Sequence, residues 1–301
     1  MMFQGGVINV LKPPGMTSHD VVSFVRRQYG QKRVGHAGTL DPAAAGVLPV
    51  FLGRATRLIE YFADADKGYR AEVILGMMTD TGDDTGKVLQ VQPVEMPDRE
   101  RLETILKEFL GVQEQVPPMY SAIKVGGKKM YELARAGVVV ERKPRTIQIE
   151  KIALINLREQ GFLFDVTCSK GTYIRTLCED IGRKLECPAV MSFLVRTHVG
   201  AFSLEDACSL EEISAQPAMV LQPADLLLKQ LPSIQLSETE FEEIIHGRIV
   251  ALGDERCQIR GPVKMYDGKR QFVGIGQMAP GTNTGSVLKP DKIMFAESSS
   301  S

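Results

Sequence analysis

The chain has no tryptophan and is poor in the residues that form disulfide bonds or bind metals. Its five cysteines are widely spaced and form no Cys-x-x-Cys pair, which argues against a disulfide framework and a zinc ribbon and is typical of a reducing compartment. Its four histidines are scattered, so no ligand cluster is visible, and neither a metal nor another cofactor is expected. These residues are Cys168, Cys178, Cys187, Cys208, Cys257, His19, His36, His198 and His246.

Long apolar runs are also absent. No run approaches the length that crosses a bilayer, which takes about 20 residues. The N-terminus has no basic segment followed by an apolar stretch and a cleavage site, which argues against a secretory signal. With 44% hydrophobic and 24% charged residues, the composition is that of an ordinary globular protein. We therefore expect a cytoplasmic protein that makes no membrane contact.

The net charge of −1 hides a segregation of charge along the chain. Residues 1–60 carry 7 basic and 3 acidic side chains, and residues 120–200 carry 14 and 8. Residues 201–245 carry 1 basic and 9 acidic side chains, and residues 246–301 carry 8 and 5. The basic segments could form positive faces for a polyanion, although solvated faces explain the charge counts equally well.

The stretch 33–50 combines charge, glycines, one carboxylate and an apolar run. Its glycines allow a tight bend close to a ligand, and Pro42 holds Asp41 in an extended or turn conformation. The apolar run 47–52 reads as a buried strand. Asp41 therefore stands on a stiff loop before a core strand, where a rigid scaffold would place a catalytic group. Asp-Pro between glycines is also ordinary turn chemistry, so the pattern alone leaves both interpretations open.

Three further segments contain candidate residues. Residues 68–76 alternate as a strand with Tyr69 on the apolar side, and residues 171–185 predict an amphipathic helix with Arg175 off its apolar stripe. From the pattern alone, Tyr69 would be strand core and Arg175 a solvated helix charge.

Residues 79–86 are rich in Asp and Thr but lack the residue order and distal glutamate of an EF-hand. We expect this segment to be a hairpin-like loop.

The segment 117–146 begins with a basic, glycine-containing stretch that carries a tyrosine. Such a segment is typical of a mobile arm that grips phosphates, and a surface hairpin with no partner is the alternative.

A domain boundary is predicted at residue 232. Beyond it, a short helix and strands broken by glycines predict a compact β-barrel-like domain over 233–297, and the serine-rich tail 298–301 is expected to be disordered.

Several motifs occur together and in one order. They are Lys-Pro-Pro-Gly-Met-Thr-Ser at 12–18, Gly-His-Ala-Gly-Thr-Leu-Asp-Pro at 35–42, Gly-Val-Leu-Pro at 46–49, and further blocks at 67–71, 120–124, 131–137 and 169–177. Together they closely resemble the bacterial tRNA pseudouridine synthase B family over roughly the first 200 residues. The part after residue 232 resembles the family's small RNA-binding PUA domain only weakly, and no residue of it is assigned a role.

The resemblance implies a fold and a reaction. The fold is the α+β pseudouridine synthase fold, with a central mixed, mainly antiparallel sheet over 1–232, followed by a PUA-like domain. The reaction isomerises uridine 55 in the TΨC loop of tRNA. The base is flipped into the pocket, the C1′–N1 bond is broken, and C1′ is joined to C5. One carboxylate suffices for this chemistry, which needs no metal.

By resemblance, Asp41 is the essential acid. Tyr69 matches the tyrosine that stacks on the uracil and serves in proton removal from C5, and Arg175 matches the arginine that keeps Asp41 charged and aimed. His36 resembles the residue that fills the RNA loop beside the extruded nucleotides. Tyr173 and Leu194 match positions that line the nucleotide pocket.

The same resemblance makes 117–146 an arm that closes on the T arm of the tRNA. Its cationic side chains would hold phosphates and make binding sensitive to salt. The residues expected in this role are Lys124, Lys128, Lys129 and Arg135.

We expect a monomer with no obligatory protein partner, and three alternatives stay open. The first is an RNA-guided or ribosomal-RNA pseudouridylase with the same core, against which the complete bacterial-type blocks argue. The second is a non-catalytic tRNA-folding module, which the presence of Asp41, Tyr69 and Arg175 disfavours. The third is a sugar-processing hydrolase, which would need a second acid that no comparable motif supplies.

Overall fold

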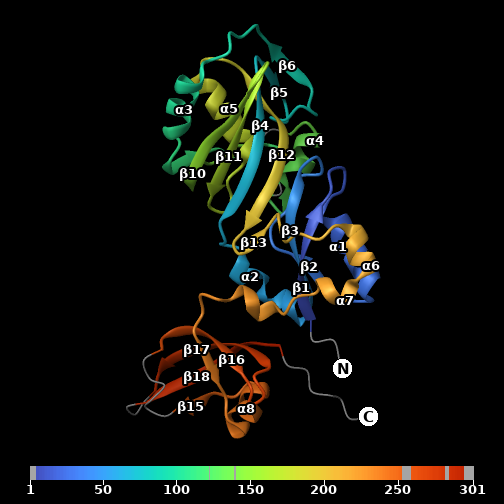
Figure 1. Ribbon diagram of the computed structural model, residues 1–301. Coiled ribbons are helices and arrows are strands. Elements are labelled where there is room, and N and C mark those ends of the chain that lie inside the picture. The colour runs from blue at the N-terminus through green and yellow to red at the C-terminus, as the bar shows by residue number, and fades with distance from the viewer. Residues whose placement is uncertain (1–4, 122, 139, 253–258, 282–284, 295–301) are drawn as a thin grey trace.

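The computed structural model describes residues 5–121, 123–138, 140–252, 259–281 and 285–294. Two units are visible in Figure 1: a larger one built on a nine-stranded sheet, and a smaller C-terminal one, coloured orange to red, built on a five-stranded sheet.

The nine-stranded sheet runs β1-β3-β12-β4-β11-β10-β7, with β2 paired to β3 and β13 paired to β12. Its neighbours are antiparallel except for β12 and β3, which are parallel. The predicted mixed, mainly antiparallel sheet is therefore confirmed. The strands are β1 (Gly5–Lys12), β2 (Val34–His36), β3 (Ala45–Gly53), β4 (Lys67–Leu75), β7 (Gly111–Gln115), β10 (Arg145–Arg158), β11 (Gly161–Cys168), β12 (Ala189–Val199) and β13 (Phe202–Ser203).

Helices gather at two places around this sheet (Figure 1). Helices α3 and α5 pack against each other and against β10 and β12, whereas α1 and α6 lie beside β2 and β1. The helices of this unit are α1 (Ser18–Tyr29), α2 (Ile59–Phe62), α3 (Arg99–Lys107), α4 (Met130–Arg135), α5 (Ile174–Lys184), α6 (Leu210–Ala215), α7 (Pro217–Val220) and the 3₁₀ turns η1 (Arg54–Leu58) and η2 (Ala224–Leu227).

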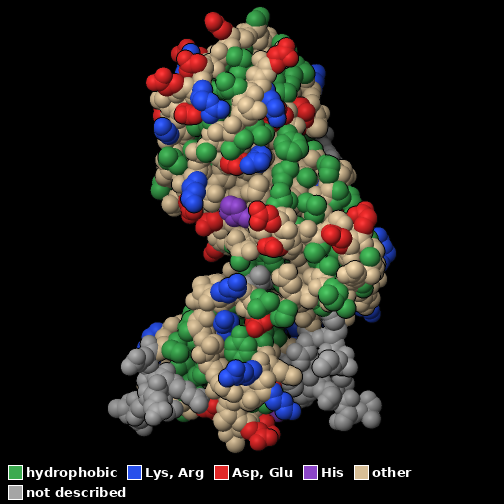
Figure 2. All heavy atoms as spheres, viewed as in Figure 1, with side chains coloured by type: hydrophobic (Ala, Val, Ile, Leu, Met, Phe, Trp, Pro, Cys, Tyr) green, Lys and Arg blue, Asp and Glu red, His purple; other side chains and the backbone are tan. Residues whose placement is uncertain are grey.

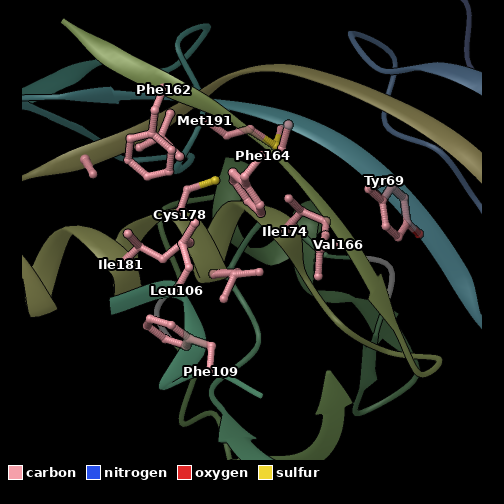
Figure 3. Packing of buried hydrophobic residues seen from close by; sticks show 14 of the residues in the cluster. Tyr69, Leu106, Phe109, Phe162, Phe164, Val166, Ile174, Cys178, Ile181 and Met191 are labelled. Carbon is pink, nitrogen blue, oxygen red and sulfur yellow. The ribbon is translucent and has the colours of Figure 1, made fainter. Parts of the chain in front are cut away.

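Local sequence explains the two helices nearest the candidate site. Helix α1 starts at a capping box between Thr17 and Asp20 and ends at Gly30 in the left-handed conformation. Helix α5 buries the predicted stripe against the sheet. Figure 3 shows how this stripe meets phenylalanines of β11 in the main core, with Tyr69 of β4 at one end of the cluster.

Two short ribbons leave the main sheet. One joins β5 (Met77–Thr79) to β6 (Val88–Val91) and projects at the top of Figure 1. The other joins β8 (Lys124–Val125) to β9 (Lys128–Lys129) and continues into α4. This second ribbon and α4 form part of the predicted arm.

The C-terminal sheet has the strand order β14-β16-β17-β18-β15. The pattern of short strands was predicted, but β14 and β16 were missed, because one is only three residues long and the other follows residues without clear alternation. The boundary at 232 stays a prediction, and the tail 298–301 lies outside the described residues. The elements are β14 (Ser233–Gln235), α8 (Glu238–Ile245), β15 (Val250–Leu252), β16 (Gly261–Tyr266), β17 (Phe272–Pro280) and β18 (Ser286–Ile293).

The C-terminal unit shares core with the larger one. Ile275 and Met294 pack in the same buried cluster as Val7 and Phe51. Hydrogen bonds surround this contact: the Tyr61 hydroxyl donates to Asp291 at 2.6 Å, and Arg57 donates to the carbonyl of Ile293 at 3.0 Å. The two units are therefore joined by buried apolar surface as well as by the chain.

The face in Figure 2 shows Lys and Arg interspersed with Asp and Glu, and neither sign forms a continuous patch on it. Among the helices of the described residues, none has the length and apolar character needed to cross a membrane.

Candidate active site

Asp41 lies on a loop between β2 and β3, and its side chain is 44% exposed. The Ala44 N–H donates to the Asp41 carbonyl at 3.1 Å and closes a turn there. Just before the turn, the buried Ser18 hydroxyl at the start of α1 accepts from the Leu40 N–H at 2.9 Å and donates to the Leu40 carbonyl at 3.2 Å. The backbone beside Asp41 is thus tied to α1.

A second buried anchor is Lys12, at the end of β1, which has no exposed surface. Its Nζ donates to the carbonyl of Pro42 at 3.2 Å and to two carbonyls of its own turn, those of Pro13 at 2.9 Å and Met16 at 2.7 Å. Burial lowers the pKa of Lys12 to about 8, and the nearby Asp41 carboxylate partly opposes this shift. A cation therefore lies beneath the loop and holds the residue that follows Asp41.

A third buried anchor, Arg196 on β12, is also fully enclosed. Its Nε donates to the carbonyl of Val47 at 2.7 Å and its Nη2 to the carbonyl of Gly38 at 3.1 Å. These two carbonyls precede and follow Asp41 in the chain. Three buried polar side chains, from β1, α1 and β12, therefore hold the loop that presents the acid.

Arg175 contacts the acid itself. Its Nη2 lies 3.1 Å from Asp41 Oδ2, and it is only 6% exposed. The same guanidinium donates to the carbonyl of Tyr120 at 2.8 Å and to that of Thr81 at 2.8 Å. The reading of Arg175 as a solvated helix charge is therefore wrong. The side chain joins α5, the loop of Asp41, the 79–86 loop and the start of the arm, and so fixes one oxygen of Asp41.

The 79–86 loop supports this arrangement. Asp83 Oδ2 lies 3.7 Å from Arg175 Nη1. Asp83 Oδ1 accepts from the hydroxyl of Thr81 at 2.8 Å and from the hydroxyl and N–H of Thr85 at 2.6 and 3.2 Å. Within the described residues, no group of three His, Cys, Asp or Glu side chains is placed to hold a metal ion. Asp83 therefore closes the turn of its own loop and faces Arg175.

Tyr69 is 8% exposed on β4, and its hydroxyl points away from the other labelled side chains of the core (Figure 3). In the antiparallel pairing of β4 with β12 it is opposite Arg196. Burial raises the pKa of Tyr69, the Arg196 charge opposes this shift, and the Asp41 charge adds to it. The phenol is therefore neutral near pH 7 and lies within electrostatic reach of both charged groups.

The apolar residues around Tyr69 bring the surrounding elements together. Leu40 and Ala44 of the Asp41 loop, Ile174 of α5 and Leu194 of β12 belong to the same buried cluster as Tyr69. Leu194 is 8% exposed, so it can line a pocket only through its edge.

His36 and Tyr173 flank the loop and α5. His36 ends β2, and its buried Nδ1 has no hydrogen-bond partner among the described residues. Burial lowers the pKa of His36, so the ring is neutral at pH 7. Tyr173 is half-buried and precedes α5; its N–H donates to Gln115 Oε1 at 2.7 Å, and Gln115 Nε2 donates to its carbonyl at 3.1 Å.

The described residues of the arm bond one another and the Arg175 side chain. The strands of the arm and α4 are tied to each other through the N–H of Met130, which donates to Ile123 at 2.8 Å, and the N–H of Tyr131, which donates to Ser121 at 3.0 Å. Lys128 is exposed on β9. The predicted residues Lys124, Lys129 and Arg135 belong to β8, β9 and α4, but their side chains lie outside those that the structure describes.

Comparison with known proteins identifies the family. Residues 26–174 match the model of the TruB family pseudouridylate synthase N-terminal domain, and residues 175–231 match that of the tRNA pseudouridylate synthase B C-terminal domain. Residues 232–292 match a pseudouridine synthase II TruB C-terminal domain. A curated relative named tRNA pseudouridine synthase B, from Caldanaerobacter subterraneus, is 48% identical over 272 residues, covering 90% of this chain and 94% of the relative. The chain belongs to the tRNA pseudouridine synthase B family.

Other relatives of that name support the membership. The protein from Bacillus licheniformis is 47% identical over 306 residues, covering 97% of this chain and 98% of the relative. The protein from Symbiobacterium thermophilum is 51% identical over 245 residues, covering 80% and 82%. The resemblance inferred from the motifs is thus confirmed over most of the chain.

Solved structures of other proteins also share the fold of this chain. An H/ACA RNP bound to a substrate RNA containing 2′-deoxyuridine has a chain similar to this one, with a TM-score of 0.73, 25% identity, and coverage of 98% of this chain and 86% of that one. A chain of an archaeal box H/ACA sRNP complex gives a TM-score of 0.70 with 25% identity and coverage of 97% and 87%. The pseudouridine synthase fold class is confirmed.

Sequence reasoning missed several residues around the tRNA pseudouridine synthase B motif. Asp83 was seen only as part of an acidic loop, and Lys12 only as part of a motif. Arg196 is two residues from Leu194, a proposed pocket residue, and strand alternation could have placed its side chain on the same face. Gln115 carried no signal, because its contact with Tyr173 links strands and helices far apart in the chain.

Proposed function

We propose that the protein is a tRNA pseudouridine synthase that converts uridine 55 of the TΨC loop into pseudouridine. One observation carries the proposal: the buried Arg175 guanidinium holds the Asp41 carboxylate at 3.1 Å. Asp41 lies on a loop whose Leu40 and Ala44 belong to the same buried cluster as Tyr69. Relatives named tRNA pseudouridine synthase B that share 47–48% identity over almost the whole chain support the same activity and the tRNA substrate.

The reaction is an isomerisation and needs no oxidant or second substrate. The C1′–N1 bond of the uridine breaks, the uracil turns over, a C1′–C5 bond forms, N1 gains a proton and C5 loses one. A carboxylate can serve this reaction by stabilising positive character at the sugar, by forming a covalent adduct, or by taking a proton from the sugar. In each case it must be aimed, and we assign that function to Arg175, which occupies one of its oxygens and leaves the carboxylate 44% exposed.

Tyr69 is assigned to the base. Its ring lies in the same buried cluster as apolar side chains of the loop and of β12, and an aromatic ring can stack on the uracil through the part that the cluster leaves exposed. Burial raises the pKa of its hydroxyl, so the free enzyme presents a neutral phenol. Its part in removing the C5 proton therefore requires the phenol to lose its own proton within the complex, next to the Arg196 cation.

The target base lies stacked within a folded RNA loop and has to be flipped out before it reaches Asp41. We assign His36 to the space beside the flipped nucleotide, because its ring is neutral at pH 7 and it ends β2 just before the loop of Asp41. Tyr173 and Leu194 would line the pocket, and Lys124, Lys128, Lys129 and Arg135 would hold phosphates of the T arm.

We further propose that the enzyme acts as a cytoplasmic monomer without a guide RNA or a protein partner. The solved neighbours come from H/ACA ribonucleoproteins and share 25% identity with this chain, whereas the tRNA pseudouridine synthase B relatives share 42–51%. The higher identity favours the stand-alone reading.

The test uses the purified full-length chain and an unmodified tRNA transcript with no other macromolecule. Pseudouridine is located by chemical modification and primer extension, and a transcript with cytidine at position 55 is the control. We expect one product site at position 55. Product only after addition of a guide RNA would assign the protein to the guided class, and binding of the transcript without any product would assign it to a folding module.

A further inference from the structure

Arg196 is an unusual residue for the interior of a sheet. It has no exposed surface, and among the ion pairs of the described residues none joins it to a carboxylate. Its partners are backbone carbonyls, those of Val47, Gly38 and, at the limit of 3.5 Å, Thr39. Enclosing a guanidinium without a counter-ion is costly, since each buried ion loses several kcal/mol of hydration in real proteins. Such exceptions to ordinary packing are found mainly at functional sites.

Its position explains what this cation can do. Arg196 is opposite Tyr69 in the register of β12 and β4. Directly opposed residues of an antiparallel pair are on the same face with Cβ atoms about 5 Å apart. The Arg196 charge also opposes the rise that burial causes in the pKa of Tyr69, in keeping with two side chains on one face of the sheet. Arg196 therefore stands beside the proposed base-stacking tyrosine across the sheet.

Arg196 also contacts the loop of Asp41. The carbonyls of Gly38 and Val47 lie on either side of the acid in the chain, and both accept from Arg196. The loop cannot shift relative to β12 without breaking one of these bonds. Gly46, which pairs with Arg196 in the parallel contact of β3 and β12, has its φ at +111°, and an added Cβ would lie 2.2 Å from the Arg196 carbonyl oxygen. The backbone of Gly46 therefore lies directly against the backbone of Arg196.

From this geometry we propose that Arg196 is a positioning residue that sets the Asp41 carboxylate and the Tyr69 phenol relative to each other. It acts on the acid through the loop carbonyls and on the phenol directly across the sheet. Lys12 and Ser18 bond the loop of Asp41 and Arg175 bonds the acid, but none of these three is opposite Tyr69 in the sheet, so the described contacts give no other residue this double connection. The proposal rests on the synthase function above.

A positioning role for Arg196 predicts a loss of reaction rate without a loss of tRNA affinity, which a general structural role does not. A shift of the acid relative to the base it acts on by about 1 Å costs roughly 100-fold in rate, because bond making requires close alignment. Binding of the RNA, which depends on phosphates and on the flipped base, would be little changed. The loss should therefore appear in the single-turnover rate constant and not in the affinity for tRNA.

The experiment compares Arg196→Lys and Arg196→Met with the wild type and with Arg70→Met. Arg70 is adjacent to Tyr69 on β4, but its side chain is on the other face of the sheet, where it binds Asp165 at 2.7 Å on the surface. Arg70→Met is therefore the matched control for removing an arginine from the same sheet. Each protein is checked by thermal unfolding and by its dissociation constant for tRNA, and pseudouridine formation is then measured under single-turnover conditions.

We expect Arg196→Met to lower the single-turnover rate constant about 100-fold or more, with tRNA affinity within about threefold of wild type. Arg196→Lys should recover part of the rate, since an ammonium group keeps the charge and reaches one or two of the carbonyls. Arg70→Met should match the wild type. If Arg196→Met does not fold, Arg196→Lys decides the question by itself through the same comparison of rate and affinity.

The inference is overturned if the rate of Arg196→Lys equals that of the wild type, or if rate and affinity fall together in proportion. A wild-type protein that forms no pseudouridine would instead refute the proposed function. The two outcomes are distinguishable, because the test of Arg196 compares the rates of its variants with that of an active wild type.

Discussion

The loop of Asp41 and the arm of residues 117–146 both contain glycines with positive φ, yet the fold holds them differently. Lys12, Ser18 and Arg196 hold the loop from three elements with side chains that are almost completely buried. The described residues of the arm bond mainly one another, and its hairpin tip is exposed. A group that performs chemistry must keep its position to a fraction of an ångström, whereas a group that grips phosphates must adapt to its ligand.

The largest effect expected from this comparison is on catalysis. Asp41→Asn keeps the size of the side chain and removes its charge, so the rate of pseudouridine formation should fall by at least about 1,000-fold. Affinity for tRNA should stay within a few-fold, because the arm and its phosphate contacts are unchanged. The matched control is Asp165→Asn, whose carboxylate is bound to Arg70 on the other face of the sheet. Measurable turnover by Asp41→Asn would remove Asp41 from its assigned role.

The second effect is on stability, and it tests rigidity directly. Gly46, at the start of β3 next to the loop, and Gly127 in the arm both have positive φ, at +111° and +84°. A Cβ at Gly46 would meet the backbone of Arg196 at 2.2 Å, whereas a Cβ at Gly127 has nothing within 4 Å. We expect Gly46→Ala to reduce the free energy of unfolding by about 3 kcal/mol or more, and Gly127→Ala by about 1 kcal/mol or less. Urea denaturation of both variants measures the difference, and equal losses would contradict it.

The third effect concerns the arm alone. Lys128→Ala removes one exposed cation from the hairpin tip, which should weaken tRNA binding about three- to tenfold at moderate salt and reduce the slope of log affinity against log salt by about 1. The rate constant at saturating tRNA should not change. Lys107→Ala, at the end of α3, is the control for losing an exposed lysine elsewhere. Binding isotherms at several salt concentrations decide the matter, and an unchanged slope would exclude a phosphate contact at Lys128.

The smallest effect is on the pH dependence of stability. Burial lowers the pKa of Lys12 to about 8 in the folded protein, from 10.5 for an ordinary lysine. Between these values the unfolded chain binds more protons than the folded one, so this residue makes folding more favourable as the pH rises from 8 towards 10.5. Between pH 7 and 9 the free energy of unfolding of the wild type should increase by about 1 kcal/mol relative to Lys12→Gln. Denaturation of both proteins at the two pH values measures this, and parallel changes would mean that Lys12 is not titrating.

Much of the molecule was predictable because its signals are local. The capping box of α1, the apolar stripe of α5 and the alternation of β4 each follow from residues a few positions apart. The motif around Asp41 and its relation to Tyr69 and Arg175 came from resemblance to the tRNA pseudouridine synthase B family. Period-2 alternation places Arg196 on the face of Leu194, but it cannot show that this charge is fully buried.

The sequence by itself determined the family and the order of the main elements, since motif order and short-range periodicity are properties of the chain. Resemblance also named Asp41 as the proposed acid and Arg175 as its partner, but only the tertiary structure decided which buried side chains hold the loop around Asp41. Arg196 reaches Val47 across 149 positions, Arg175 reaches Thr81 across 94, and Lys12 reaches Pro42 across 30. These bonds form because the sheet order β1-β3-β12-β4 brings distant segments side by side. A buried polar group must find a partner there, and the partners are carbonyls, which every residue carries and no sequence pattern distinguishes.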